Sequence, residues 1–568
     1  MSRNQKLIFA VIFLTASFLF FYRLGRHDML LDDGHYAFRA LGYFDFLNSE
    51  KQTTPVQWFG HRPVWSYLSF HDHPPLFFLL QNLVFKIFGA SVVSSRLLSV
   101  FAALGTVSLT FFLGRRLGGT SRVGLLAAGA LVLNTHFIWT GRIGLLESLL
   151  IFFLTTGLFF LVKGWQDQER NFLWAGLFFG FAFLTKFTVL ATLPGIFVFL
   201  IWQKRVVLKS KMAWLGAAIF LAVISPVVVY NIATFQTRGH FDVQFSQVFN
   251  QPPTDWPLLS NRLTGQDWDF MSFISTGPHY VSWPYFLVFL LSLPFAIWFG
   301  RRNGKKEIFL TLFALGSLEA FFLYVAPNFI WMGIVSPFVA LTIAFGLEKI
   351  FSLPVMQKKL ANVVTAAGLL LTGLGSLFFS INTNHLTNPI GNKNFYAEYR
   401  LENLGYNQLD QKMRVLLSRA SSPVSALPPY IGSGGVNLRR FDGKSQREFK
   451  GVIVFDSQAN WFPTIWTFQR FRIYNRMFIV SIEEFFEILE REDVLERLPV
   501  DGIYFVSPND NLKHPVTELQ AYSTRLRQDF EKLEVTPEVI HDDKQNEAFY
   551  IYYANWPSIK KLWKSGPL

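Results

Sequence analysis

Long apolar stretches recur along the first two thirds of the chain, and each approaches the length of a membrane-crossing helix. A helix needs about 20 mostly apolar residues to cross the hydrocarbon core, and roughly eleven stretches come near that length. They lie at residues 7–22, 95–113, 123–140, 145–162, 172–185, 187–202, 213–231, 281–299, 308–325, 329–347 and 360–380. The pattern predicts an α-helical polytopic membrane protein.

Two of the apolar segments allow a second interpretation. Leu7–Tyr22 has the length of a signal-peptide core, but Arg23-Leu24-Gly25-Arg26 follows it in place of a small-residue cleavage site, so we interpret it as a span. Leu76–Phe88 is short and contains three polar residues, Gln81, Asn82 and Lys86. We interpret it as a helix in the outer interface. The alternative, a short span, would invert every later segment.

Charge then orients the spans. Only 16% of residues are charged, well below the roughly 25% of a soluble protein, and the net charge is +13. The basic residues gather in alternate connections, namely Arg3, Lys6, Arg115, Arg116, Arg122, Lys163, Arg170, Lys204, Arg205, Lys209, Lys211, Arg301, Arg302, Lys305, Lys306, Lys349, Lys358 and Lys359. The positive-inside rule makes these connections and the N-terminus cytoplasmic. The same distribution removes the support that +13 alone lends to nucleic-acid binding.

This topology leaves three large pieces on the outer face of a cell membrane: residues 23–94, 232–280 and the tail from 384. The predicted domains are therefore a transmembrane domain, 1–383, and an extracytoplasmic soluble domain, 384–568. The chain has no Cys, which excludes disulfides and thiolate metal sites.

The tail has the pattern of an α/β domain. Phe449–Phe455, Met477–Ser481 and Gly502–Val506 resemble buried strands. Ile482–Leu498 has apolar residues at helical spacing, and Asn394–Leu417 is also predicted to be largely helical. Two roles stay open for this domain: acceptor recognition or a lid over the membrane site, or simple packing on the outer loops.

Candidate chemistry concentrates in the first outer loop. Asp32-Asp33 follows the first span by about ten residues and opens an amphipathic run. Phe70-His71-Asp72-His73-Pro74-Pro75-Leu76 ends the loop. Acids and histidines at a membrane surface suit a substrate that is half lipid and half polar. By themselves the two acids are more typical of a helix cap.

In order and topology these motifs resemble the GT-C superfamily of membrane glycosyltransferases that use polyprenyl-phosphate sugars, in particular its protein O-mannosyltransferase and lipid A aminoarabinose transferase branches. The shared features cover much of residues 7–350. They are Asp32-Asp33, His73-Pro74-Pro75-Leu76, Arg142 with Glu147, Leu184-Thr185-Lys186 and Ser336-Pro337. Two departures matter: the acidic pair is usually Asp-Glu, and the residue before Pro-Pro is the His of the first branch and not the Lys of the second.

The resemblance implies an inverting glycosyltransferase that acts at the outer face. Asp32 is implied as the base that takes the acceptor's proton, with Asp33 as the second choice. His73, Arg142 and Lys186 are the candidates for binding the donor phosphate. Each has a plainer explanation: His73 caps the Pro-Pro turn, and the two cations snorkel from span ends. We interpret Glu147 as a structural partner of Arg142.

A divalent metal is a further option, with Asp72 and His73 as ligands and His240 or His279 as distant partners. No cofactor is required by the pattern. The partners expected are a polyprenyl-phosphate sugar and a lipid, glycan or protein acceptor. The alternatives are a transporter or flippase for a lipid-linked substrate, or a non-catalytic scaffold. Transporters usually show paired repeats and broken helices at the midplane, whereas this chain places its polar residues in outer loops.

Overall fold

The computed structural model describes residues 1–43, 72–249, 251, 277–302, 306–325, 333–418, 421–422, 447–448, 451–475, 477–489, 500–513 and 517–564. The chain divides into two compact units. The membrane unit comprises Met1–Leu24 and Lys51–Leu401, and the α/β unit comprises Gly25–Glu50 and Glu402–Leu568. The chain therefore passes between the units three times, after Leu24, after Glu50 and after Leu401. The predicted boundary at 383/384 instead falls in the last turn of the helix Lys359–Asn384.

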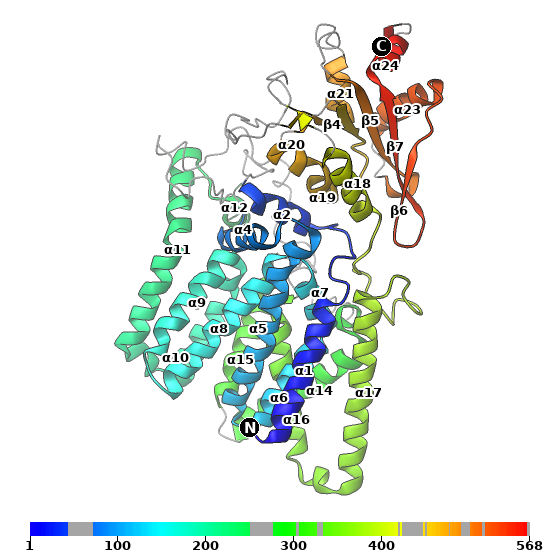
Figure 1. Cartoon of the computed structure of the whole chain (residues 1–568). Helices are drawn as coiled ribbons and strands as arrows, with labels where there is room; N and C mark the ends of the chain where they lie inside the picture. The colour runs from blue at the N-terminus through cyan, green and yellow to red at the C-terminus, as the bar shows by residue number, and fades with distance from the viewer. Residues whose placement is uncertain are drawn as a thin grey trace. The chain divides into compact units, whose positions relative to one another are not determined.

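The membrane unit consists of helices that run back and forth (Figure 1). In chain order they are α1 (Arg3–Phe21), α4 (Leu76–Phe88), α5 (Val92–Gly118), α6 (Ser121–Val132), α7 (Thr135–Arg142), α8 (Leu146–Gln166), α9 (Asn171–Thr185), η2 (Phe187–Thr192), α10 (Leu193–Gln203), α11 (Lys211–Arg238), α12 (Val243–Val248), α14 (Trp283–Arg302), η4 (Lys306–Ile308), α15 (Phe309–Val325), α16 (Ser336–Phe351) and α17 (Lys359–Asn384). Each apolar stretch predicted from the sequence overlaps at least one of these helices.

Among the described residues, seven helices are long and apolar enough to cross a bilayer: α1, α5, α8, α11, α14, α16 and α17. Helices α6 and α7 pass the same test only when taken together, and they are bent by 66° at the break between them. The bend corrects the expectation of one straight span over 123–140. It occurs where the Asn134 side chain accepts a hydrogen bond from the backbone N–H of Phe137 and starts a new helix. The polytopic helical class is confirmed, while the predicted count of eleven spans is not.

Ion pairs join the loops at one end of the membrane unit. Arg116 lies 2.8 Å from Asp167, Arg122 lies 2.6 Å from Glu348, and Lys204 lies 2.9 Å from Glu307. The first pair joins the end of α5 to the residue after α8, and the second joins the start of α6 to the end of α16. The third joins the residue after α10 to the segment before α15. Exposed pairs of this kind contribute about 0–1 kcal/mol each. These pairs matter mainly for where they lie: the connections that carry the basic residues are found at the same end of the membrane unit as the N-terminus of α1 (Figure 1).

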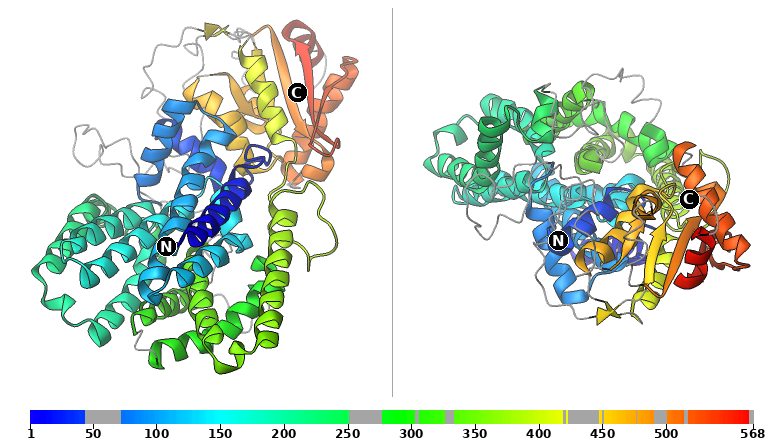
Figure 2. Two further views of the ribbon diagram at one scale, coloured as in Figure 1. Left: turned by 60° about the horizontal axis from the view of Figure 1, so that its bottom comes forward. Right: turned by 90° about the horizontal axis from the view of Figure 1, so that it is seen from above.

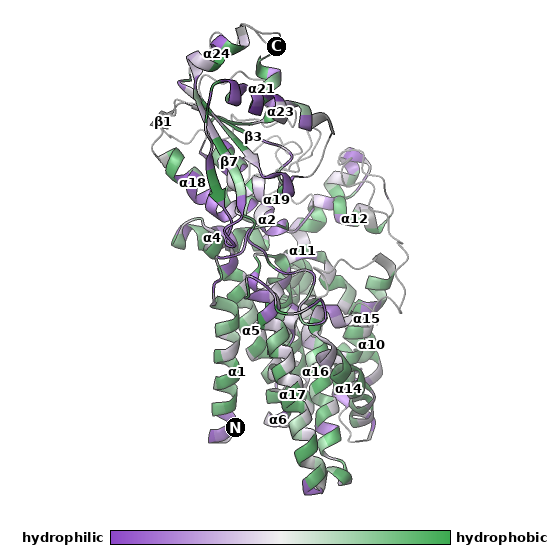
Figure 3. Ribbon diagram, turned by 90° about the vertical axis from the view of Figure 1, so that its right-hand side faces the viewer, coloured by the Kyte–Doolittle hydropathy of each residue, from purple (hydrophilic) through white to green (hydrophobic). Residues whose placement is uncertain are grey.

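Helices α11 and α17 lie at opposite edges of the membrane unit (Figures 1 and 2). Only 17% of the apolar window of each is buried. Side chains such as Leu221, Leu370 and Leu371 are more than half exposed. Figure 3 shows that hydrophobic residues, in green, predominate along the helices of this unit. A helix that is apolar on its uncovered side is typical of one that faces lipid.

The α/β unit contains a five-stranded sheet in the order β4-β3-β5-β7-β6. Strand β3 pairs in parallel with β4 and β5, whereas β7 is antiparallel to β5 and β6. A separate short pair, β1 and β2, is antiparallel. The strands are β1 (Ser421–Ser422), β2 (Arg447–Glu448), β3 (Gly451–Phe455), β4 (Ile479–Ser481), β5 (Gly502–Pro508), β6 (Glu538–His541) and β7 (Glu547–Asn555). The helices are α2 (Asp32–Gly42), α18 (Tyr406–Ser418), α19 (Trp461–Thr464), η9 (Ile465–Gln469), α20 (Arg470–Tyr474), α21 (Ile482–Leu489), η10 (Asp510–Leu512), α23 (Thr517–Lys532) and α24 (Trp556–Lys564).

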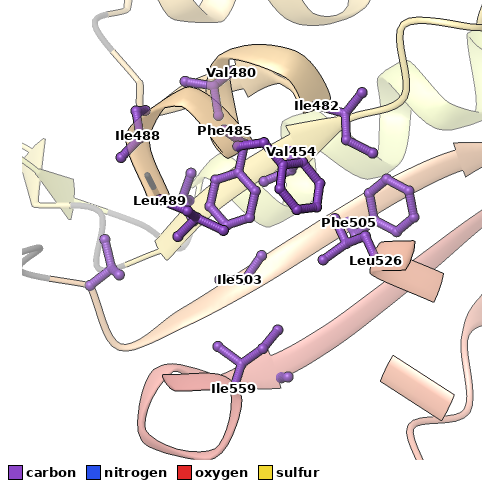
Figure 4. Packing of buried hydrophobic residues seen from close by; sticks show 14 of the residues in the cluster. Val454, Val480, Ile482, Phe485, Ile488, Leu489, Ile503, Phe505, Leu526 and Ile559 are labelled. Carbon is purple, nitrogen blue, oxygen red and sulfur yellow. The ribbon is translucent and has the colours of Figure 1, made fainter. Parts of the chain in front are cut away.

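The sheet is buried on both faces. Val452 and Val454 point into one hydrophobic cluster, which Phe485 of α21 and Leu526 of α23 complete (Figure 4). The intervening Ile453 and Phe455 point into a second cluster with residues of α18 and η9. Because β3 is covered twice, it is apolar throughout, which is the pattern that identifies it in the sequence.

One helix prediction in this unit is wrong at its start. The pattern predicts helix over Asn394–Leu417, but α18 begins only at Tyr406. Gly405 has a φ of +93°, a left-handed conformation that cannot continue a right-handed helix. For Ile482–Leu498, the structure confirms helix through Leu489, and the remainder lies outside the described residues.

Candidate functional site

Arg142, the last residue of α7, is 1% exposed and bound to the end of another helix. Its Nη1 donates to the carbonyl oxygens of Leu19 (2.6 Å) and Phe20 (3.0 Å). These belong to the last turn of α1, whose carbonyls have no partners within the helix. Arg142 therefore caps α1, which is a structural role that the snorkelling interpretation did not foresee.

Lys186 and Glu147 form a buried ion pair. Lys186 directly follows α9, and Glu147 lies in the first turn of α8; they are 6% and 0% exposed. Lys186 Nζ donates to Glu147 Oε1, while Glu147 Oε2 has no hydrogen-bond partner among the described residues. The predicted pairing of Glu147 with Arg142 is therefore wrong. The partner of Glu147 is Lys186, which lies 39 residues further along, directly after α9.

Asp72 and His73 lie together just before α4. His73 Nδ1 is 2.9 Å from Asp72 Oδ2, and both side chains are mostly buried. Pro75 precedes the first residue of α4, so the Pro-Pro turn leads straight into the helix. Their neighbour in the sequence, His71, lies outside the described residues.

Asp242 is a further acid near Asp72, and it lies between α11 and α12, outside the spans. It is fully buried, and it accepts hydrogen bonds from Phe245 N (2.9 Å) and Asn231 Nδ2 (2.7 Å). Burial raises the pKa of Asp242 to about 7, and repulsion from Asp72 adds to the effect. Sequence reasoning missed this residue, although an acid directly before a helix, two residues after His240, is a readable signal.

Stability should depend on this carboxyl. Because its folded pKa exceeds its unfolded value, its contribution is most favourable at low pH and is lost as pH rises from about 4 to about 7. As pH increases from 5 to 8, we expect the free energy of unfolding of Asp242→Asn to rise relative to that of the wild type. The expected difference is on the order of a few kcal/mol. Melting curves of both proteins across this range test the expectation, and parallel curves would contradict it.

A small cleft lies between α7, α14 and α16 of the membrane unit. Its walls are apolar, formed by Val281, Tyr285, Phe286, Phe289, Val335 and Val339. His136 and Ser336 add polar groups, and Ser336 belongs to the late Ser-Pro element of the sequence. The His136 ring stacks on Trp139 at 5.2 Å and meets the edge of Tyr399 at 5.0 Å. An apolar cleft with a few polar groups is typical of a site for an apolar ligand with a polar end.

The acidic pair opens α2 in the α/β unit. Asp33 is 2% exposed, and its Oδ1 accepts a hydrogen bond from Leu31 N at 3.2 Å. Asp32 is only partly buried. Both carboxylates lie in the first turn, where the helix dipole favours negative charge. Asp33 thus closes the turn at the helix start, and Asp32 is the more accessible of the two.

The proposed metal ligands do not make a complete site. Within the described ranges, no group of three or more His, Asp or Glu side chains is arranged to hold a metal ion. Asp72 and His73 are adjacent but supply only two ligands, fewer than the three protein ligands of typical catalytic zinc sites. We therefore derive no step through a metal.

One segment of the chain matches the model of a known protein family. Residues 72–230, which include His73, Arg142, Glu147 and Lys186, match the family described as dolichyl-phosphate-mannose-protein mannosyltransferase. An uncharacterized protein of Aquifex aeolicus (strain VF5) is 32% identical over 133 residues, or 23% of this chain and 30% of that protein. The chain matches about a third of the length of its curated relatives.

Solved structures resemble the chain over nearly its whole length. ArnT from Cupriavidus metallidurans bound to undecaprenyl phosphate has a TM-score of 0.52 and 14% identity, covering 97% of this chain and 98% of that one. The archaeal oligosaccharyltransferase AglB from Archaeoglobus fulgidus, in complex with an inhibitory peptide and a dolichol-phosphate, has a TM-score of 0.50 and 13% identity, covering 97% and 74%. Family match and fold together confirm the resemblance that the motifs indicate: the chain has the fold of the GT-C membrane glycosyltransferases.

Proposed function

We propose that this protein moves a sugar from a polyprenyl-phosphate donor to an acceptor at the outer face of the membrane, with inversion at the sugar carbon. The observation that carries the proposal is the family match over residues 72–230, because that segment contains the buried Glu147–Lys186 pair, the Asp72–His73 pair and Arg142. The fold shared with a protein bound to undecaprenyl phosphate supports the same donor class.

Asp32 acts as the general base in this proposal. It removes the proton from the acceptor hydroxyl as the acceptor oxygen attacks C1 of the sugar. The bond between C1 and the phosphate oxygen breaks, and its electron pair leaves with the polyprenyl phosphate. Asp32 suits the role better than Asp33, because Asp33 is buried and holds the Leu31 amide. A well-placed carboxylate contributes typically about 10²–10⁴-fold to such a step.

Lys186 stabilises the charge that develops on the departing phosphate. An ammonium group has three donors, and Lys186 gives one of them to Glu147 Oε1. In this proposal its positive charge faces the phosphate oxygen. Glu147 fixes the position of the ammonium before the reaction, which lets the cation act without reorganisation. His73, whose Nδ1 lies 2.9 Å from Asp72 Oδ2, is the second phosphate ligand. Arg142 supports the site mainly by securing α1.

The apolar cleft between α7, α14 and α16 takes part of the isoprenoid chain. Its six apolar wall residues provide the contacts, and His136 and Ser336 lie where a polar end can be met. The default role of aromatic residues in this chain is core or membrane belt, but Tyr285, Phe286 and Phe289 line this cleft.

The direct test is turnover of a panel of donors. Purified protein in nanodiscs is incubated with polyprenyl phosphates carrying mannose, aminoarabinose, galacturonic acid or other sugars, and released polyprenyl phosphate is measured. The proposal expects release from at least one donor in the presence of an acceptor. A protein that binds polyprenyl phosphate but turns over no member of a broad panel would speak against a transferase.

Which face of the membrane each end of the protein occupies can also be tested. Because the sequence contains no Cys, an introduced Cys is the only thiol that a reagent can label. Lys209, near the basic end, and Lys544, in the α/β unit, are exposed. We expect a membrane-impermeant maleimide to label Lys544→Cys in spheroplasts, and to label Lys209→Cys only after the membrane is opened. Labelling in the opposite order would reverse the topology and move the reaction to the cytoplasmic face.

A further inference from the structure

The helix that carries Asp32 is built into the α/β unit. Residues of Gly25–Glu50 cluster with Glu402–Leu568 although more than 350 residues separate them in the chain. We propose that the C-terminal domain is a positioning element of the transferase site, in which Asn407 and Tyr474 hold α2 and thereby the base. This inference rests on the proposed function of Asp32 and assigns the tail a task in the reaction itself.

The first anchor joins the segment before α2 to the start of α18. The Asp28 carboxylate accepts hydrogen bonds from three backbone amides, those of Leu404 (2.6 Å), Tyr406 (3.1 Å) and Asn407 (2.8 Å). It thus caps α18 from a distant part of the chain. In return, Asn407 Nδ2 donates to the carbonyls of Gly25 (3.1 Å), Arg26 (3.0 Å) and His27 (3.0 Å).

The second anchor holds α2 itself. Tyr474 of α20 donates its hydroxyl proton to the carbonyl of Phe38 at 2.8 Å. Phe38 is fully buried in a small cluster with Ile465 and Ile473. Gly34 allows the close approach, since a Cβ there would lie 2.9 Å from the carbonyl oxygen of Phe462.

An ion pair ties the two anchors together. Asp410 of α18 pairs with Arg470 of α20, and the two side chains are 6% and 5% exposed. Arg470 also lies over the ring of Trp466, 4.2 Å from its centre. The contacts are therefore continuous: Asp28 binds α18, α18 pairs with α20, and α20 binds α2. Asp32 lies between the two anchors, so its position follows that of the α/β unit.

Positioning of this kind affects the chemical step more than donor binding. The candidate phosphate ligands His73 and Lys186 belong to the membrane unit, whereas the base belongs to the α/β unit. A displacement of about 1 Å in a reacting group can lower the rate about 100-fold. Loosening α2 should therefore lower kcat and leave the affinity for polyprenyl phosphate unchanged.

The test uses two variants of the full-length protein with matched controls. Asn407→Ala removes the amide of the first anchor, and Tyr474→Phe removes the hydroxyl of the second. Asn509→Ala and Tyr550→Phe remove the same groups elsewhere in the unit, where Asn509 Nδ2 donates to the Tyr550 hydroxyl at 3.1 Å. We expect kcat to fall at least about tenfold in the anchor variants, with polyprenyl-phosphate affinity within about twofold, and expect no such fall in the controls.

Hydrogen exchange supplies a measurement that does not depend on turnover. The amides of α2 should exchange faster in Asn407→Ala than in Asn509→Ala. Unchanged exchange in α2, or equal kcat in anchor variants and controls, overturns the proposal. The outcomes also separate it from the proposed function: an active Asp32→Asn rejects the base, whereas an inactive Asp32→Asn with fully active anchor variants keeps the base and rejects the positioning role.

Discussion

Asp32→Asn is expected to lower kcat by at least about 100-fold while the protein stays folded, because general-base catalysis by a placed carboxylate contributes typically about 10²–10⁴-fold. Asparagine keeps the size of the side chain and cannot accept the acceptor's proton. Asp32 is only partly buried at the start of α2, and asparagine keeps an oxygen that can accept a hydrogen bond there, so the variant is expected to fold. The measurement is the rate of polyprenyl-phosphate release at saturating donor, together with the melting temperature.

Two companion variants define the assignment. Asp501→Asn changes an exposed acid elsewhere in the α/β unit and should leave the rate unchanged. Asp33→Asn should have a smaller effect than Asp32→Asn, because an asparagine oxygen can still accept the hydrogen bond from Leu31 N. If Asp33→Asn is the inactive variant and Asp32→Asn is active, the two roles are reversed.

The second large effect concerns the buried pair of Lys186 and Glu147. Lys186→Met alone leaves the Glu147 carboxylate buried without a counter-charge, which typically costs about 3–5 kcal/mol of stability. The double variant Lys186→Met, Glu147→Gln removes both charges and should regain most of that stability. Its kcat/KM for the donor should nevertheless stay at least about 100-fold below wild type, because a charged donor to the developing phosphate charge is lost.

A matched pair at the other end of the membrane unit provides the control. Lys204→Met, Glu307→Gln removes an ion pair of 2.9 Å at the basic end and should preserve both stability and turnover. If the Lys186, Glu147 double variant is stable and fully active, the pair is only structural. Of the candidate phosphate ligands, His73 would then remain, because Arg142 caps α1.

The membrane part of the fold was predictable because its signal is local. About 20 consecutive apolar residues identify a span without knowledge of any partner, and each predicted stretch overlaps at least one helix. The bend between α6 and α7 was missed because its signal is a single polar residue and not a long apolar stretch. Asn134 caps a new helix inside a stretch that is apolar on average, so hydropathy alone hides the break.

The candidate site was predictable as a set of residues and less so as a set of contacts. The motifs locate Glu147 and Lys186 without showing that they pair, since a partner 39 residues away depends on how α8 and α9 pack. Asp242 stands out only once its burial and its nearness to Asp72 are known. Arg142 is bound to α1 carbonyls more than 120 residues earlier, a contact that no spacing rule suggests.

The α/β unit shows the same limit. Strands β3, β4 and β5 are apolar and could be predicted. Strand β6 at the sheet edge has only two half-buried residues, which lie between two exposed ends. The membership of residues 25–43 depends on hydrogen bonds from Asp28 and Asn407 that join distant segments. Local pattern therefore finds the elements, and the tertiary contacts decide which unit holds Asp32.

The measurement that tests the central claim most directly follows the donor lipid in proteoliposomes with and without acceptor. A transferase breaks the bond between the sugar and the phosphate, whereas a flippase moves the intact lipid and a scaffold does neither. The account predicts acceptor-dependent release of polyprenyl phosphate, equal in amount to the sugar transferred. Intact donor moving across the bilayer, with no release in the presence of a full panel of acceptors, would contradict it.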